Sequence, residues 1–258
     1  SRFAAAATVY TDDLIIPTVV INIVRKIMTE DSGTWKALAY LEECKTQDPG
    51  FNFRVRYDKE GMPNSILWMD SRMRSNLIRF GDILCLDVQK RQYNRSGFPY
   101  CSPVAKDDDF RAAQCAESII VEETDEVYAW ILKSMKAVEP RWDMSKLRII
   151  FGDQHVSTVL LQKLNIQASC TLRGDYYHLY NEVWPKAFCQ HFQSIKHYLK
   201  AMLESKTQEE WDSPFCRARQ ALCYLPHLVQ KLEDIHQQPS YYAGYYLREM
   251  GGSLGMMG

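Results

Sequence analysis

The sequence predicts a mixed α/β fold, in which helices flank a single sheet and a helical region follows it. Three observations support this prediction. Three strand-like segments come first in the central part of the chain, strands alternating with helices follow them, and the signals after Pro185 are helical throughout. Antiparallel strands followed by strand–helix units are typical of a mixed sheet covered by helices.

This order divides the chain into three regions. Residues 1–63 form an N-terminal helical and hairpin extension, residues 64–184 form the core, and residues 185–258 form an all-helical insertion. Apolar residues at helical spacing in residues 11–46 predict two helices, with a break at residues 31–33. Residues 51–57 alternate apolar and polar side chains and, with residues 65–69, predict a β-hairpin.

Within the core, residues 81–88 form an almost continuous apolar run that predicts a strand buried on both faces. Residues 147–151 have the same character. Further strands are predicted at residues 100–104, 112–121 and 168–172, and helices at residues 127–138, 158–164 and 176–183.

Composition limits the class of protein. The chain has 258 residues, of which 46% are hydrophobic and 24% charged, as in globular proteins. The longest apolar stretch, residues 14–24, is interrupted by Pro17 and Asn22 and is shorter than the ~20 residues of a membrane-spanning helix. Eight cysteines without a Cys-x-x-Cys pair favour reduced thiols and an intracellular protein.

The charge is nearly balanced overall but uneven along the chain. A formal net charge of −1 gives no general electrostatic signature of nucleic-acid binding. Residues 72–95 nevertheless hold an excess of cations, which could contact phosphates or could equally form a solvated charged face. The cations are Arg72, Arg74, Arg79, Lys90, Arg91 and Arg95, and the anions are Asp82 and Asp87.

Two aspartates come at the ends of the two buried strands. Asp87 ends the first strand and Asp153 follows the second. If these strands are neighbours, both carboxylates lie at the sheet edge where α/β proteins bind ligands. Paired carboxylates favour Mg²⁺ or Mn²⁺, and two such ions can activate a nucleophile and stabilise the leaving oxygen of a phosphodiester. Alternatively, an aspartate at this position caps the next helix.

An ordered series of short motifs resembles the core signature of Mutator-like element (MULE) transposases over about residues 35–185. The motifs are LWMD at residues 67–70, FGDILCLD at 80–87, FP at 98–99, EETDEVYAW at 122–130 and GD at 152–153. The resemblance implies an RNase H-like five-stranded mixed sheet and a DDE metal triad in which Asp87 and Asp153 are the first two acids.

The same resemblance implies a function. MULE transposases cleave transposon ends and transfer the strands with Mg²⁺ or Mn²⁺ in a two-metal site, so DNA is the expected partner and the nucleus the expected location. Several copies of the chain would assemble on transposon ends. Residues near the predicted site are candidates for contacts with DNA: Lys90, Arg91, Arg95 and His155.

The sequence departs from this family in three places. Val88-Gln89-Lys90 stands where the family has Thr-Thr-Tyr, and only His178 remains of a Cys-x-x-His pair. Zinc at Cys170 or His178, or at Cys189 and His191, is therefore a weaker interpretation than a core thiol and packed imidazoles. No residue matches the third acid, a glutamate, which we expect beyond Gly258.

Three functional hypotheses remain open. The first is an active DDE transposase. The second is a catalytically inactive, domesticated derivative that binds DNA or protein, as some transposase-descended plant transcription regulators do. The third is an unrelated RNase H-like nuclease, which needs a further carboxylate within the sheet, and Glu117 is the candidate for it.

Overall fold

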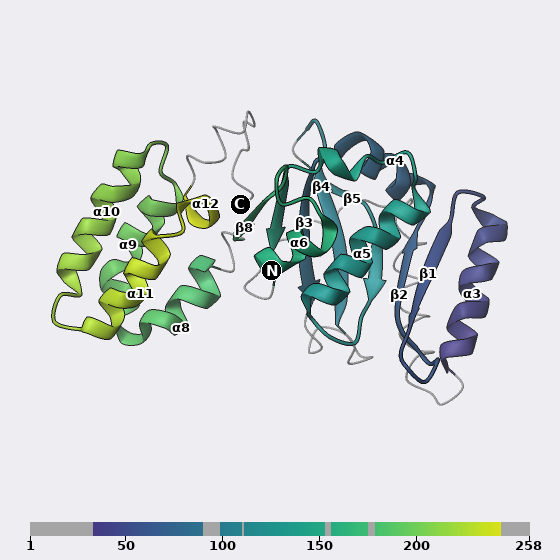
Figure 1. Cartoon of the computed structure of the whole chain (residues 1–258), viewed down its shortest axis with the longest axis horizontal. Helices are drawn as coiled ribbons and strands as arrows, with labels where there is room; N and C mark the ends of the chain where they lie inside the picture. Colours follow the sequence, from purple (N-terminus) through teal and green to yellow (C-terminus); the bar gives the residue numbers. More distant parts are fainter. Residues whose placement is uncertain (1–32, 90–98, 110, 153–155, 175–178, 244–258) are drawn as a thin grey trace.

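The computed structural model describes residues 33–89, 99–109, 111–152, 156–174 and 179–243. The first predicted helix, within residues 11–31, and the glycine-rich tail lie outside these residues. Figure 1 shows the described part as a sheet covered by helices, followed by a helical region beyond one edge of the sheet.

One sheet of eight strands organises the molecule, which confirms the predicted mixed α/β class. Its order is β1-β2-β6-β4-β3-β7-β8, and β5 pairs with β4 beside this path. The strands β3, β7 and β8 are parallel to one another, and the other pairs are antiparallel. The strands are β1 (Asn52–Tyr57), β2 (Pro63–Met69), β3 (Ile83–Gln89), β4 (Tyr100–Lys106), β5 (Ala112–Gln114), β6 (Glu117–Ile119), β7 (Ile149–Gly152) and β8 (Thr171–Gly174).

The sheet is larger than the five strands expected. The strands β6-β4-β3-β7-β8 form the predicted mixed sheet, and the hairpin β1–β2 extends it because β2 pairs with β6. The strand predicted over residues 112–121 is divided into β5 and β6. Only β6 contacts both β2 and β4, whereas β5 closes a hairpin on β4.

One helix was not predicted from the sequence. Helix α4 (Ser71–Phe80) follows β2 directly, and the Asp70 side chain caps it by accepting a hydrogen bond from the Met73 amide at 2.6 Å. Its buried residues, Met73 and Leu77, are one turn apart, which is the helical spacing of an amphipathic segment.

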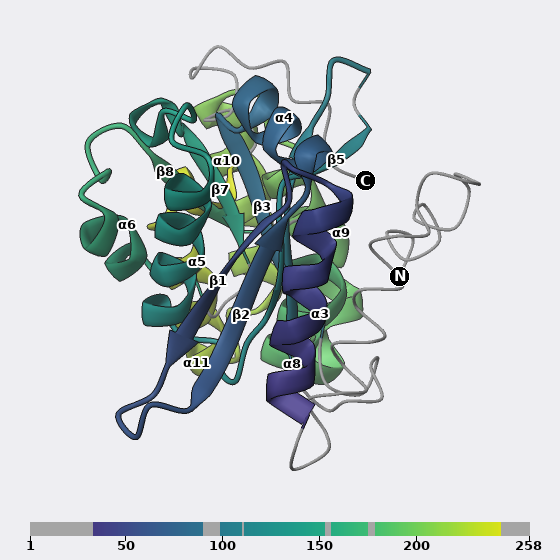
Figure 2. The same ribbon diagram turned by 90° about the vertical axis from the view of Figure 1, so that its right-hand side faces the viewer.

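Helices cover both faces of the sheet (Figure 2). On one face, α4, α5 (Asp125–Val138) and α6 (Thr158–Leu164) cover a cluster that includes Leu84 and Leu86 of β3. On the other face, α3 (Gly33–Gln47) covers a smaller cluster beside the hairpin, in which Leu41 packs with Trp68 and Ile119. Successive strand residues alternate between these two clusters, as the pleat requires.

The region after β8 is helical, as predicted, and has a hydrophobic core of its own that includes Trp184, Phe188 and Trp211. The short helix η2 (Met144–Lys146) precedes β7 in the sheet part of the chain. The elements of the helical region are η3 (Leu179–Val183), α8 (Trp184–Phe188), η4 (Cys189–His191), α9 (Phe192–Leu203), α10 (Gln208–Ala221), α11 (Pro226–His236) and α12 (Pro239–Tyr242).

The helical region joins the sheet at β8. Arg173 of β8 is 3% exposed, and its guanidinium donates hydrogen bonds to the carbonyls of Ser240 and Ala243 at the end of α12. Tyr241 packs against both hydrophobic cores. The close approach of this ring leaves no room for a side chain at Gly174, because a Cβ there would lie 2.8 Å from Tyr241.

In the part of the chain that the structure describes, no helix is both long and apolar enough to cross a membrane. All eight cysteines lie in described segments, and none of them forms a disulfide.

Candidate functional site

Asp87 lies near the end of β3, in the middle of the sheet. It is directly opposite Ser102 of the antiparallel strand β4, and its side chain is half-buried. On the other side β3 pairs in parallel with β7, and Leu86 lies opposite Gly152. Asp153 follows Gly152 in the chain but lies outside the described residues, so its predicted meeting with Asp87 stays a prediction.

Strand pairing places two polar residues, Ser102 and Glu117, in a row with Asp87 across the sheet. Directly opposed residues of antiparallel strands point to the same face. Ser102 follows Cys101, which pairs with Ser118, so Ser102 lies beside Glu117, and Glu117 lies opposite Trp68. Trp68 belongs to the cluster under α3. Asp87, Ser102 and Glu117 therefore share the face that α3 partly covers.

Glu117 is a carboxylic acid enclosed by the protein. It is 1% exposed, and Gln114 donates a hydrogen bond from Nε2 to its Oε1 at 2.7 Å. The same amide nitrogen lies 2.9 Å from Ser102 Oγ. Burial raises the pKa of Glu117 to about 7, although hydrogen bonds from Tyr100 and Gln114 oppose the rise. Glu117 is therefore linked to the residue opposite Asp87 through one glutamine.

The described residues supply an incomplete ligand set for the predicted divalent ion. A half-buried aspartate opposite a serine suits the oxygen preference of Mg²⁺, but these are two ligands at most. Within the described segments, no group of three or more His, Cys, Asp or Glu side chains is placed to hold a metal. Mg²⁺ or Mn²⁺ at Asp87 and Asp153 therefore stays a prediction.

Most of the other predicted site residues lie outside the described segments, namely Lys90, Arg91, Arg95, His155 and His178. Of the zinc candidates, Cys170 is 4% exposed, and burial raises the pKa of its thiol to about 12. A thiol held protonated in this way is a poor zinc ligand. Cys189 is exposed and lies within 3.1 Å of the Lys186 carbonyl, while the His191 ring packs edge-on against Tyr224.

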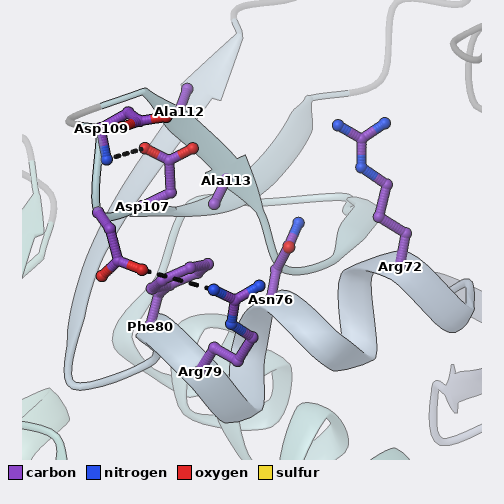
Figure 3. Close-up of a pocket in the computed structure, with 9 residues that line it drawn as sticks. Arg72, Asn76, Arg79, Phe80, Asp107, Asp109, Ala112 and Ala113 are labelled. Atoms are coloured by element: carbon purple, nitrogen blue, oxygen red, sulfur yellow. Dashed lines mark hydrogen bonds and ion pairs between the residues drawn. The ribbon is translucent and has the colours of Figure 1, made fainter.

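The three arginines of α4, which belong to the cation-rich residues 72–95, differ in their surroundings. Arg74 is partly buried, with 23% of its side chain exposed, and its Nε lies 2.9 Å from a carboxylate oxygen of Glu139, a side chain with 0% exposure. Arg72 and Arg79 instead line an open cleft between α4 and the turn from β4 to β5 (Figure 3). Of the three α4 arginines, Arg72 and Arg79 are exposed and Arg74 is partly buried.

The cleft encloses about 410 Å³ and carries charges of both signs. Asp107, Asp108 and Asp109 form the wall that faces the two arginines, and Arg79 Nη2 lies 3.4 Å from Asp108 Oδ2. The acidic turn begins five residues after Ser102 along β4, so the cleft is separate from Asp87.

The sequence contains the signals of helix α4, which lines this cleft: Asp70 is a typical N-cap, and Met73 and Leu77 are one turn apart.

A second cap anchors the chain just after Asp153. Asp125, in the first turn of α5, accepts a hydrogen bond from the Ser157 amide at 3.0 Å. Ser157 in turn caps α6 by accepting a hydrogen bond from the Val159 amide at 3.1 Å. The start of α6 is thereby fixed to the start of α5.

The comparisons with known proteins agree with this topology. Residues 42–164 match the family described as the RNaseH-like domain of zinc finger SWIM domain-containing protein 1/3. This part of the chain is an RNaseH-like domain. It contains the hairpin, strands β3 to β7 and helices α4 to α6, and therefore Asp87 and Glu117.

Two proteins to which this chain is similar come from Arabidopsis thaliana. Protein FAR1-RELATED SEQUENCE 7 is 26% identical over 108 residues, which is 40% of this chain, and Protein FAR-RED IMPAIRED RESPONSE 1 is 17% identical over 189 residues, which is 73% of this chain. The matches cover only 14% and 22% of the lengths of these relatives.

Proposed function

We propose that this chain is the RNaseH-like part of a transposase-derived regulator, which binds DNA or protein partners in the nucleus without cleaving DNA. The match of residues 42–164 to the RNaseH-like domain of zinc finger SWIM domain-containing proteins carries this proposal. The similarity to two FAR1-named proteins supports it. In this proposal the motifs resemble those of MULE transposases because the chain descends from such an enzyme. Val88-Gln89-Lys90, which replaces Thr-Thr-Tyr after Asp87, is a change beside the former catalytic site.

A second candidate function is metal-dependent cleavage and strand transfer at transposon ends by an assembly of several copies. The parallel register of Leu86 with Gly152 favours it, because Asp87 and Asp153 each follow one of these paired residues. A divalent ion held by the two acids would activate the attacking oxygen and neutralise the phosphodiester in the transition state. The third acid of the triad is unassigned in this proposal.

Nicking of supercoiled plasmid DNA in Mg²⁺ or Mn²⁺ distinguishes the two functions. The chain, its Asp87→Asn variant and a matched Asp108→Asn variant are compared, since Asp108 is exposed and lies in the separate α4 cleft. The regulator predicts equal background nicking by all three proteins. Metal-dependent nicking that is lost in Asp87→Asn but kept in Asp108→Asn would establish the second function instead.

A further inference from the structure

The strand β1 forms one end of the sheet. Among the described residues, no strand pairs with its outer side, whereas β8 at the opposite end contacts α12. β1 is six residues long and has no proline. The Phe53 amide of this strand donates a hydrogen bond to the Asn52 side chain at 2.9 Å. An edge of this kind otherwise presents backbone N–H and C=O groups to which an extended segment can add as a further strand.

The side chains of this edge are cationic on one face. Arg54 is exposed, and Arg56 is two residues further along, so both point to the same side of the sheet. Arg56 is half-buried, and its Nη1 is enclosed without a hydrogen-bond acceptor among the described residues. Lys163 and, to a lesser extent, Arg56 lower the pKa of the Glu126 carboxyl at the start of α5, so Arg56 already has a carboxylate nearby. Arg54 is therefore the cation that an incoming carboxylate can reach.

Apolar side chains lie at the turn end of the same hairpin. Tyr57 and Met62 are large hydrophobic residues, and each is 51% exposed. An added strand that continues past the end of β1 would contact Tyr57, whereas Met62 lies on the β2 side of the hairpin, where its carbonyl accepts a hydrogen bond from the Asp58 amide. The edge thus offers backbone groups, an exposed cation and one apolar side chain.

The charges also decide which partner fits. In an antiparallel pair with a second copy of β1, the registers that align most of the strand place Arg54 opposite Arg54 or Arg56. Like charges directly opposed across a sheet are destabilising. Glutamate or aspartate on an incoming strand would instead lie opposite the exposed Arg54.

We propose that the outer edge of β1 is a docking site for an extended, acidic protein segment. The segment adds antiparallel or parallel to β1, with a carboxylate against the exposed Arg54. This inference rests on the proposed function in one respect, since it names the kind of protein partner that a non-catalytic regulator would bind.

Two synthetic peptides of alternating pattern test the proposal on the complete chain. One alternates glutamate with valine and the other alternates lysine with valine, and binding is followed by fluorescence anisotropy and by hydrogen exchange of the backbone amides. We expect the acidic peptide to bind at least tenfold more tightly than the basic one and to slow exchange within residues 52–57.

The variant Arg54→Glu reverses the charge at an exposed position, so it leaves the fold intact, and Arg217→Glu is the matched control on an exposed position of α10. We expect the first to lower the affinity for the acidic peptide at least tenfold and the second to leave it unchanged. Equal binding of both peptides, protection outside β1, or equal effects of both variants would overturn the proposal. Self-association that Arg54→Glu alters, measured by sedimentation, would replace the acidic segment with a second copy.

Because plasmid nicking does not involve β1, the two proposals fail separately. Nicking that depends on Asp87 would refute the non-catalytic function and leave peptide binding at β1 unaffected. Failure of the peptide to bind would leave the arginines as a guard against sheet aggregation, with the proposed function still open.

Discussion

The sheet and the helical region solve the burial of polar groups differently. The core of the sheet part encloses charged side chains, among them Glu117, Glu139 and Arg173, whereas Ser205 is the buried polar residue of the described helical region. Helices satisfy their own backbone groups, so the helical region needs few polar side chains inside. Glu117 and Glu139 have shifted pKa values, so we expect the sheet part to be sensitive to pH and the helical part to be sensitive mainly to packing.

The largest effect is expected from a cavity in the helical region. Trp211 has 0% exposure and lies in the separate core of that region, so Trp211→Ala should cost about 3–5 kcal/mol. Hydrogen exchange should accelerate in residues 192–243 while the strands stay protected. Equal acceleration in β3 and β4 would show that the two regions unfold as one unit.

Removal of the Arg173 hydrogen bonds, which connect the sheet to the helical region, should lower the free energy of unfolding somewhat less. Arg173→Met keeps most of the buried side-chain volume but removes the hydrogen bonds to the Ser240 and Ala243 carbonyls. We expect a loss of about 2–4 kcal/mol and two separate thermal transitions in calorimetry. A single transition with unchanged midpoint would contradict the role of Arg173 as the connection.

Acid should destabilise the sheet part through Glu139. Hydrogen bonds from Arg141, with Arg74 nearby, lower the pKa of Glu139 to about 2. An acid with a lowered pKa stabilises the fold above its unfolded pKa of about 4.5 and loses this effect as the pH falls toward 2. Glu139→Gln should therefore cost about 2 kcal/mol at pH 7 and progressively less below pH 4.5, as measured by urea unfolding. A pH-independent difference would refute this assignment.

Glu117 should show the opposite dependence and the smallest effect. Because its pKa is raised to about 7, its contribution to stability is greatest below pH 4.5 and is lost as the pH rises to 7 and above. Glu117→Gln should stabilise the protein by about 1–2 kcal/mol at pH 8 and leave it nearly unchanged at pH 4.5. The exposed Glu122→Gln is the matched control, and a similar pH trend in it would assign the effect elsewhere.

Much of the fold follows from periodicity in the sequence. The buried strands β3 and β7 are nearly continuous apolar runs, and α6 begins and ends at the predicted residues. The division of residues 112–121 into β5 and β6 was not predictable, because it depends on which neighbour each half pairs with. Helix α4 was not predicted, although its N-cap residue Asp70 and the spacing of Met73 and Leu77 are visible in the sequence.

The candidate site was less predictable for a physical reason. The sequence placed Asp87 at the end of a buried strand, and the register agrees with this position. It also named Glu117 as a possible further acid, but only the pairing of β4 with β6 brings Glu117 beside Ser102. Pairing between strands far apart in the sequence depends on the whole sheet. The contact of Arg173 with α12 also joins residues far apart in the sequence, so local patterns do not predict it.

A regulator that does not cleave DNA has no need of a metal at Asp87, and calorimetric titration of the chain with Mn²⁺, repeated with Asp87→Asn, measures whether one binds there. We expect the same weak, unsaturable heats for both proteins. Saturable binding by the unaltered chain that disappears in Asp87→Asn would contradict this expectation and identify a metal-dependent site.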